Sequence, residues 1–263
     1  MTDEHVSVTH AADGTVGRLT FDRPEFNNAM DQQAADELNQ AAIDLVEDES
    51  VRCIVLTGTG GAFNTGADLT TLSGDGSDGA AVRRIAGDLH GMVSRLVRAP
   101  KPVVCGVNGV AAGGGVGPAI CGDIVLAAES ARFEFAYPRI GLSADGGSSY
   151  FLPRLVGLRE AQRIAFRDEP VGAEEAVDIG LATEAVPDDE FEERLAEEAA
   201  ALAEGPTLAH AATKGLLRGS FDRSLNEQLA TEAETIAGLT ATADFERGLD
   251  AFLGDGDATF EGG

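Results

Sequence analysis

The sequence lacks several features that would point to particular classes of protein. Its 263 residues include no tryptophan and only two lysines, Lys101 and Lys214. No apolar run approaches the roughly 20 residues that a membrane-spanning helix needs, so no membrane contact is expected. The first residues, MTDEHVSVTH, lack the basic and apolar regions of a secretory signal,. These absences favour a cytoplasmic protein.

Metal and disulfide chemistry also lack support in the sequence. The three cysteines have no CxxC spacing and lie in apolar surroundings, which is typical of buried thiols in a reducing compartment. Three of the histidines have no carboxylate or cysteine at the spacing of a metal ligand. We therefore predict no disulfide and no metal site at the three cysteines and these three histidines, which are Cys53, Cys105, Cys121, His5, His10 and His210.

Positive charge is scarce throughout the chain. The sequence has 45 acidic against 19 basic residues, a formal net charge of −26. Such a surface disfavours binding to nucleic acid or to anionic membranes. Acid excess with few lysines resembles proteins of salt-loving organisms, whose charges are screened by ions. An acidic partner-binding face is the alternative, but the acids spread over the whole chain, which favours a solvated halophilic surface.

The pattern of hydrophobic residues indicates an α/β protein. Two alternating segments around Asp13–Gly14 predict a hairpin, and continuous apolar strands with helices between them follow it. From Val171 onward helices dominate. We therefore expect an α/β core over residues 1–200 and a C-terminal helical segment over residues 201–263. The Gly- and Asp-rich tail GDGDATFEGG is expected to be frayed,.

Two Gly-rich segments share one design, in which a buried strand leads through a glycine turn into a helix. They read CIVLTGTGGAFNTGADL and VVCGVNGVAAGGGVG. Glycine permits close approach to a ligand, and helix N-termini present unpaired N–H groups to negative charge. Two such turns side by side could form an oxyanion hole. Tight packing between strand and helix is the alternative, and neither segment matches a phosphate-binding loop.

A known family carries these segments in the same order. The chain contains FDRPEFNNAM, GTGGAFNTGADL, PKPVVCGVNGVAAGGG, CGDIVLAAESARFEF, GLSADGGSSYFLPRLVG and DFERGLDAFL. It resembles the enoyl-CoA hydratase/isomerase (crotonase) superfamily over nearly its whole length. The resemblance implies a spiral of ββα turns with a C-terminal helical segment that builds a homotrimer or a dimer of trimers. It also implies an acyl-CoA thioester substrate, with coenzyme A as part of the substrate and no separate cofactor.

The resemblance also implies roles for individual residues. The backbone N–H groups of Ala67 and Gly114 would form the oxyanion hole, which stabilises the enolate of a thioester. The coenzyme A moiety and the substrate would lie along Phe26, Asn27, Ala29, Thr65, Gly66, Asp68, Leu69 and Gly113.

The two glutamates of the hydratase branch are missing here. Their positions are occupied by Gly117 and Arg139. Glycine cannot move a proton and arginine stays protonated in proteins. The usual two-carboxylate addition of water therefore cannot run from these positions.

Asp145, in the turn GLSADGGSSY, is the candidate that remains. On local pattern alone it could instead cap the helix that follows. It matches the catalytic aspartate of epoxyphenylacetyl-CoA isomerases, of dihydroxynaphthoyl-CoA synthases and of chlorobenzoyl-CoA dehalogenases. His90 falls where dehalogenases carry the histidine that activates water, although a helix histidine is often a surface residue. Tyr137 matches a dehalogenase tryptophan that supports the aspartate.

We therefore expect an enzyme that stabilises a thioester enolate and transfers a proton as enoyl-CoA isomerases do, with Asp145 as acid and base. Three alternatives stay open. They are an enoyl-CoA hydratase, a dehalogenase- or hydrolase-like enzyme with a nucleophilic Asp145, and a non-enzymatic acyl-CoA-binding protein.

Overall fold

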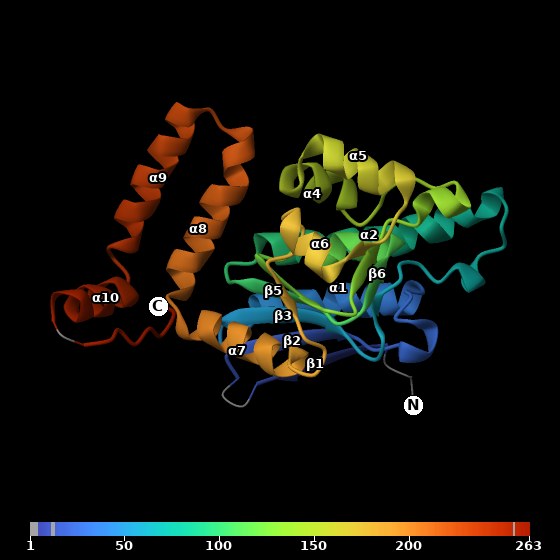
Figure 1. Ribbon diagram of the computed structural model, residues 1–263. Coiled ribbons are helices and arrows are strands. Elements are labelled where there is room, and N and C mark those ends of the chain that lie inside the picture. The colour runs from blue at the N-terminus through green and yellow to red at the C-terminus, as the bar shows by residue number, and fades with distance from the viewer. Residues whose placement is uncertain (1–4, 12–13, 255) are drawn as a thin grey trace.

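The computed structural model describes residues 5–11, 14–254 and 256–263. Its larger sheet has six strands in the order β1 (Val6–His10), β2 (Val16–Phe21), β3 (Cys53–Gly58), β5 (Val103–Val107), β7 (Ile124–Ala128) and β10 (Glu184–Val186). β1 pairs antiparallel with β2, and every other pairing in this sheet is parallel. The predicted hairpin is confirmed by this first pair, although Asp13 of its turn lies outside the described residues. Figure 1 shows the arrangement.

A smaller sheet stands beside the larger one. It contains β4 (Ala62–Asn64), β6 (Val110–Ala112), β8 (Arg132–Glu134) and β9 (Val171–Gly172), in that order. β4 follows β3 in the chain, β6 follows β5, and β8 follows β7. Each of these three turns of the chain thus gives one strand to each sheet before a helix follows. The expected spiral of ββα turns is confirmed.

Helices cover these sheets. They are α1 (Gln32–Glu47), α2 (Gly79–Arg98), α3 (Val116–Ala119), α4 (Ser148–Leu155), α5 (Gly157–Arg167), α6 (Ala173–Asp178) and α7 (Phe191–Glu204), with short 3₁₀ turns η1 (Pro24–Phe26), η2 (Leu69–Thr71), η3 (Gly76–Asp78), η4 (Gly113–Gly115) and η5 (Tyr137–Ile140). α2 packs against α1 and buries an apolar stripe that recurs at helical spacing, namely Ile85, Leu89, Met92, Val93 and Leu96,. Within the described residues no helix is both long enough and apolar enough to cross a membrane.

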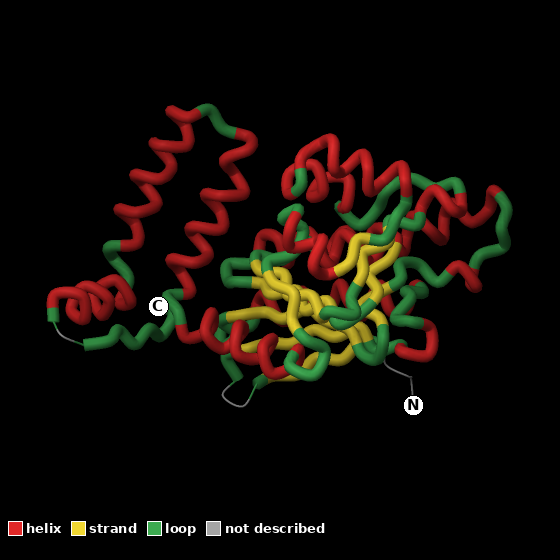
Figure 2. The backbone as a smooth tube through the Cα atoms, in the orientation of Figure 1, coloured by secondary structure: helices red, strands yellow, loops and turns green. Residues whose placement is uncertain are grey.

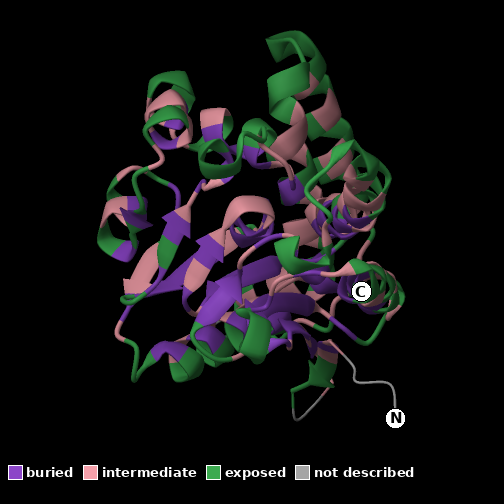
Figure 3. Ribbon diagram, turned by 90° about the vertical axis from the view of Figure 1, so that its right-hand side faces the viewer, coloured by how far each residue is buried: buried purple, intermediate pink, exposed green. Residues whose placement is uncertain are grey.

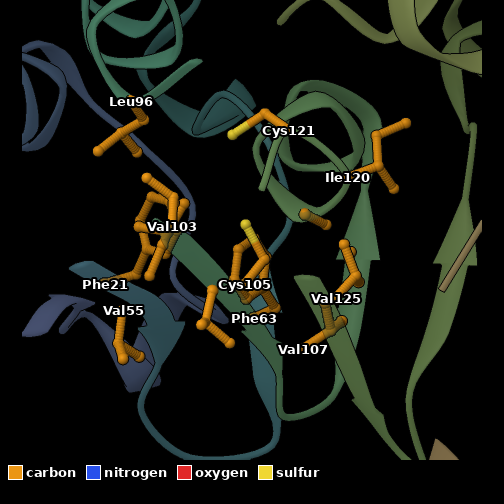
Figure 4. Packing of buried hydrophobic residues seen from close by; sticks show 14 of the residues in the cluster. Phe21, Val55, Phe63, Leu96, Val103, Cys105, Val107, Ile120, Cys121 and Val125 are labelled. Atoms are coloured by element: carbon orange, nitrogen blue, oxygen red, sulfur yellow. The ribbon is translucent and has the colours of Figure 1, made fainter. Parts of the chain in front are cut away.

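The core lies between the sheets and these helices. Every residue of β3 and of β5 is buried, as expected for parallel strands covered on both faces,. Figure 3 shows these strands at the centre of the molecule. All three cysteines are buried and unpaired, and burial raises the pKa of the Cys53 thiol to about 12. Cys105 and Cys121 lie among apolar neighbours in Figure 4, so the predicted buried thiols are confirmed.

Three helices lie beyond the core: α8 (Thr207–Gly219), α9 (Leu225–Leu239) and α10 (Ala243–Leu253), with η6 (Ser220–Asp222) after α8. α8 and α9 form a hairpin that stands apart from the sheets (Figure 2). Asp123 ties α8 to the core, because its carboxylate accepts from Lys214 Nζ at 2.7 Å and from Arg218 at 3.0 Å. Residue 200 lies inside α7, which packs on the larger sheet. The division of the chain into two parts stays a prediction.

The expectation of a frayed tail is wrong for residues 260–263. The carboxylate of Asp244 accepts from the backbone N–H groups of Glu261 and Gly262, both at 2.8 Å. Arg52 of the core donates to the carbonyl oxygen of Phe260 at 3.1 Å. Composition suggested fraying because glycine and aspartate favour irregular backbone, but these long-range hydrogen bonds fix the segment.

Candidate active site

Two backbone amides lie next to each other at the ends of β4 and β6. Ala67 follows β4 and Gly114 belongs to η4 after β6, and because these strands are parallel neighbours, their ends meet. Met30 N donates to Gly66 O at 2.7 Å, and Asp68 N donates to Met30 O at 2.8 Å. The N–H of Ala67 belongs to the same trans peptide group as Gly66 O and points the opposite way, so it points away from Met30,. Among the described residues, neither Ala67 N nor Gly114 N has a hydrogen-bond acceptor.

Glycine at position 66 makes this approach possible. Gly66 has φ +84°, and a Cβ atom there would lie 2.8 Å from Gly114 N. Any side chain would therefore be strained and would push the two segments apart. Ala67 and Gly114 are both only half-buried, so a ligand can reach these amides, and two amides side by side can hydrogen-bond to one oxygen,. This arrangement matches the expected oxyanion hole, while its use in binding a thioester stays a prediction.

Asp145 and His90 form a hydrogen-bonded pair, which we call the dyad. Asp145 lies between η5 and α4, and His90 lies on α2. His90 Nε2 is 2.6 Å from Asp145 Oδ1, although 55 residues separate them in the sequence. The side chains keep 53% and 35% of their surface exposed, so the pair is open to a ligand. The alternative in which Asp145 caps α4 is wrong, because the N-cap is Gly147 and no side chain caps that helix.

Buried partners fix the backbone of Asp145. Its N–H donates to the hydroxyl of Tyr137 at 2.9 Å, and its carbonyl oxygen accepts from Ser148 Oγ at 2.8 Å. Tyr137 is buried and packs edge-to-face on Phe135. Burial raises the pKa of Tyr137, and the nearby charge of Asp145 raises it further. Tyr137 therefore stays neutral at ordinary pH and keeps its place beneath the aspartate.

The two positions that carry glutamate in the hydratase branch are closed to this role. A Cβ atom at Gly117 would overlap the carbonyl oxygen of Gly146 and lie 2.5 Å from its carbonyl carbon. Arg139 is turned to other partners, with Nε 2.5 Å from Asp168 and Nη1 2.9 Å from Glu134. Asp145 is thus the candidate carboxylate that remains, and the adjoining Gly146 packs against Gly114.

A cavity of about 890 Å³ borders the dyad. It runs along α2 from His90 to Arg98, with α4 and α8 as further walls. Its apolar lining includes Val93, Val97, Ala99, Pro100, Tyr150, Phe151 and Ala211. Ala67 and Gly114 do not line this cavity. Gly146 does, however, and a Cβ atom on it would lie 2.7 Å from Gly114 O, so the amides and the cavity are neighbours.

The residues expected along coenzyme A gather on two connected segments. Thr65 Oγ1 donates to Asn27 O at 3.1 Å, and the bonds of Met30 join the same segments. Phe26 and Leu69 are 46% and 48% exposed, which leaves apolar surface for a ligand. Ala29, Gly66 and Gly113 lie on these segments or next to them.

The carboxylate of Asp68 is occupied within the protein. It accepts from the Thr70 hydroxyl at 2.6 Å and lies 3.5 Å from Arg23. The Thr70 hydrogen bond is the main cause that lowers the pKa of Asp68. Asp68 therefore supports the loop, and its side chain is not free for a ligand. In the described part of the chain, no three histidine, cysteine or acidic side chains gather as metal ligands would.

Sequence reasoning missed several residues that shape this site. Leu89 lies under both turns, with Cδ2 3.4 Å from a Cβ position on Gly146 and 3.7 Å from one on Gly114. Ser148 is fully buried beneath Asp145. Both residues look like ordinary packing residues in the sequence, and no local signal distinguishes them. Their role depends on contacts between segments that lie far apart in the chain.

Comparisons with known proteins agree with this geometry. The sequence profile of the enoyl-CoA hydratase/isomerase family matches residues 11–263. A Rhodobacter capsulatus protein named "probable enoyl-CoA hydratase" is 42% identical, over 89% of this chain and 90% of its own. The 1,2-epoxyphenylacetyl-CoA isomerase of Escherichia coli is 34% identical over 97% and 98% of the two chains. 4-Chlorobenzoyl coenzyme A dehalogenase-2 of an Arthrobacter species is 32% identical over 95% and 91%.

Solved structures give the same result for the fold. The enoyl-CoA hydratase of Bacillus anthracis superposes with a TM-score of 0.92 at 27% identity, and the match covers 99% of this chain and all of the other. The profile spans almost the whole chain, and the relatives match in both sequence and fold. The chain belongs to the enoyl-CoA hydratase/isomerase family, within the crotonase superfamily.

Proposed function

We propose that this enzyme is an isomerase of acyl-CoA thioesters that transfers a proton through Asp145. One observation carries the proposal. The Asp145 carboxylate is hydrogen-bonded to His90, and the adjoining Gly146 packs against Gly114, whereas both glutamate positions of a hydratase are closed. An isomerase needs only one such group, because the same carboxylate can remove a proton from one carbon and return it to another.

Each part of the site has a role in this reaction. The N–H groups of Ala67 and Gly114 would bind the thioester oxygen, where negative charge develops as the enolate forms. Asp145 accepts the proton whose bonding electrons move into the enolate, and it gives the proton back when those electrons form the new C–H bond. His90 orients the carboxylate, and Tyr137 and Ser148 fix its backbone. The acyl group extends past the dyad into the cavity along α2, whose apolar lining suits an apolar chain,.

The test is Asp145→Asn, which keeps the shape of the side chain but cannot take a proton. Proton exchange and isomerisation of a 3-enoyl-CoA in deuterated high-salt buffer should fall by about 10²–10⁴-fold, with little change in substrate affinity. Asp189→Asn is the matched control, because Asp189 is exposed and does not line the cavity. Unimpaired turnover in Asp145→Asn would overturn the proposal.

The contact between His90 and Asp145 also favours a second candidate, nucleophilic catalysis. The Asp145 carboxylate would attack a carbon that carries a leaving group, which departs with its bonding electrons. His90 would then remove a proton from a water molecule that attacks the resulting aspartyl ester and restores the carboxylate. The 32% identical relative named as a 4-chlorobenzoyl coenzyme A dehalogenase supports keeping this candidate.

The two candidates predict different outcomes. In the nucleophilic reaction, quenched turnover leaves the substrate joined to Asp145 as an aspartyl ester that mass spectrometry detects, and His90→Gln makes this ester accumulate. In the isomerase reaction no covalent intermediate forms. Under that reaction His90→Gln lowers turnover without any adduct.

Two further alternatives, a hydratase and a binding protein without activity, can be tested with the same purified enzyme. The 42% identical relative is named a probable hydratase, so crotonyl-CoA hydration should be measured in high salt. We expect it to be weak or absent because both glutamate positions are closed. A binding protein without activity would bind acyl-CoA but exchange no α- or γ-protons with deuterated solvent, which NMR of the ligand would detect.

A further inference from the structure

The glycine at position 117 has no conformational explanation. Gly117 is not among the residues with positive φ, so its backbone would accept any L-residue,. It lies within α3, where glycine is less favourable than alanine by about 1 kcal/mol,. The position therefore requires glycine because a side chain there would have no room.

That space is filled by the backbone of the turn that carries Asp145. A Cβ atom at Gly117 would lie 2.5 Å from the carbonyl carbon of Gly146 and 3.2 Å from its Cα atom. An ordinary contact begins at 3.4 Å, so the turn would have to retreat by roughly 1 Å to clear the carbonyl carbon and by more to clear the carbonyl oxygen,. Flexible side chains could adjust, but these neighbouring atoms belong to the main chain.

The turn has little freedom to retreat. A Cβ atom on Gly146 would lie 2.7 Å from Gly114 O, and one on Gly147 would lie 2.8 Å from the ring of Phe151. Both glycines have positive φ, +60° and +85°. Asp145 itself is bonded through its backbone to Tyr137 and Ser148. Residues 145–147 therefore fit one narrow position between α3, η4 and α4.

We propose that Gly117 is a positioning residue for the dyad, an inference that rests on the proposed role of Asp145. The absence of a side chain at position 117 lets the turn seat deeply enough for Asp145 Oδ1 to reach His90 Nε2 at 2.6 Å. A carboxylate side chain at position 117 would occupy the volume that Gly146 fills when the dyad is formed. Such a side chain and the dyad therefore exclude each other. Glutamate at position 117 would thus destroy the present site without creating the two-carboxylate site of a hydratase.

The main test compares Gly117→Ala with Gly87→Ala. Gly87 lies on α2 close to His90, and nothing stands within 4 Å of a Cβ atom there. Gly117→Ala should lower kcat by about 10²-fold with little change in KM, since a 1 Å misplacement of a catalytic group costs about that much. Gly87→Ala should keep full activity. Gly117→Glu should gain no crotonyl-CoA hydration.

A spectroscopic readout separates positioning from loss of structure. The chain has only four histidines, so the ring ¹⁵N signals of His90 can be assigned with His90→Gln. Gly117→Ala should move these signals toward those of an unpaired imidazole, as Asp145→Asn does, while the thermal melt stays cooperative. In the His90→Gln background, Gly117→Ala should cost little further activity, because the contact it disturbs is already gone.

The outcomes distinguish this inference from the proposed function. Gly117→Ala with unchanged His90 signals and turnover within about twofold of the natural enzyme would overturn the inference while leaving Asp145 in its role. If the natural enzyme shows no proton exchange, and Gly117→Ala still loses the His90 signals of the dyad, the inference is upheld and the proposed function is overturned. If Gly117→Ala does not fold, Leu89→Ala is added to free space beside Gly146. A folded double variant with an intact dyad would also overturn the inference.

Discussion

At the scale of single residues, the sequence identified the candidate groups, but it did not predict how those groups are arranged. Asp145 and His90 were both candidates, but their contact joins segments 55 residues apart and has no local signature. The capping alternative failed because the side chain of Asp145 turns to His90 and no side chain caps α4. The missing glutamates were visible in the sequence. The reason that Gly117 must stay small depends on the fold, which brings Gly146 against it.

Asp68 gives a prediction about acid stability. The hydrogen bond from Thr70, with smaller help from Arg23, lowers its pKa in the folded state. A lowered carboxyl pKa contributes stability that is complete above the unfolded value of 3.8 and is lost as the pH falls through the folded value,. Asp68→Asn should therefore reduce the free energy of unfolding by about 1–3 kcal/mol at neutral pH.

The difference between the two proteins should shrink as the pH falls below about 4, because the natural carboxylate then takes up its proton. Urea unfolding at a series of pH values in molar salt measures this directly. The exposed Asp222 serves as the control through Asp222→Asn. A gap that stays constant across the acidic range would show that Asp68 contributes by shape alone.

At the scale of elements, the site is built from equivalent places in successive turns of the spiral. Ala67 follows β4, Gly114 follows β6, and Asp145 comes after β8 and η5. Repeated strand–glycine–helix segments indicated the first two places, because their pattern is local. The third place carries no similar pattern, since η5 and a loop separate β8 from Asp145. Only the resemblance to a family suggested it.

The paired amides predict a loss of catalysis without loss of binding. Ala67→Pro and Gly114→Pro each remove one N–H donor. Turnover should fall by at least about 10²-fold for each, as it does when other oxyanion holes lose a donor, while acyl-CoA still binds. Steady-state kinetics and calorimetric titration measure the two quantities, and far-UV circular dichroism checks that the variant is folded. Full activity in a folded variant would place the oxyanion hole elsewhere.

At the scale of the whole molecule, composition was informative about the surface and silent about assembly. The net charge of −26 spreads over the chain, and we propose that it reflects adaptation to high salt. The melting temperature should rise between low and molar salt, because the Debye length shortens from about 10 Å at 0.1 M to about 3 Å at 1 M and screens the repulsion. A midpoint that does not change between these conditions would contradict the proposal.

The C-terminal helices predict self-association. Their described residues expose many large apolar side chains: Leu217, Phe221, Leu225, Leu229, Ile236, Phe245, Leu249, Phe252 and Leu253. We propose that they build a homotrimer or a dimer of trimers, since exposed apolar patches of this kind mark interfaces. Sedimentation in molar salt gives the mass directly. Phe252→Asp, at a side chain 86% exposed, should shift the protein toward smaller species, and a monomeric natural protein would refute the proposal.

The strand order of the larger sheet allows the sheet to fold in the order in which its strands are synthesised. From β1 to β10 the strands join in the sequence in which a ribosome delivers them, so each new ββα turn docks on the edge left by the one before. Nascent chains begin to fold from their N-terminal side, and no strand here has to insert between two already paired. The amide of Ala67, the amide of Gly114 and the carboxylate of Asp145 arrive with three consecutive additions. The three groups proposed for catalysis are therefore together once the third of these turns, which ends with α4 at Leu155, settles against the second, before the C-terminal helices have been made.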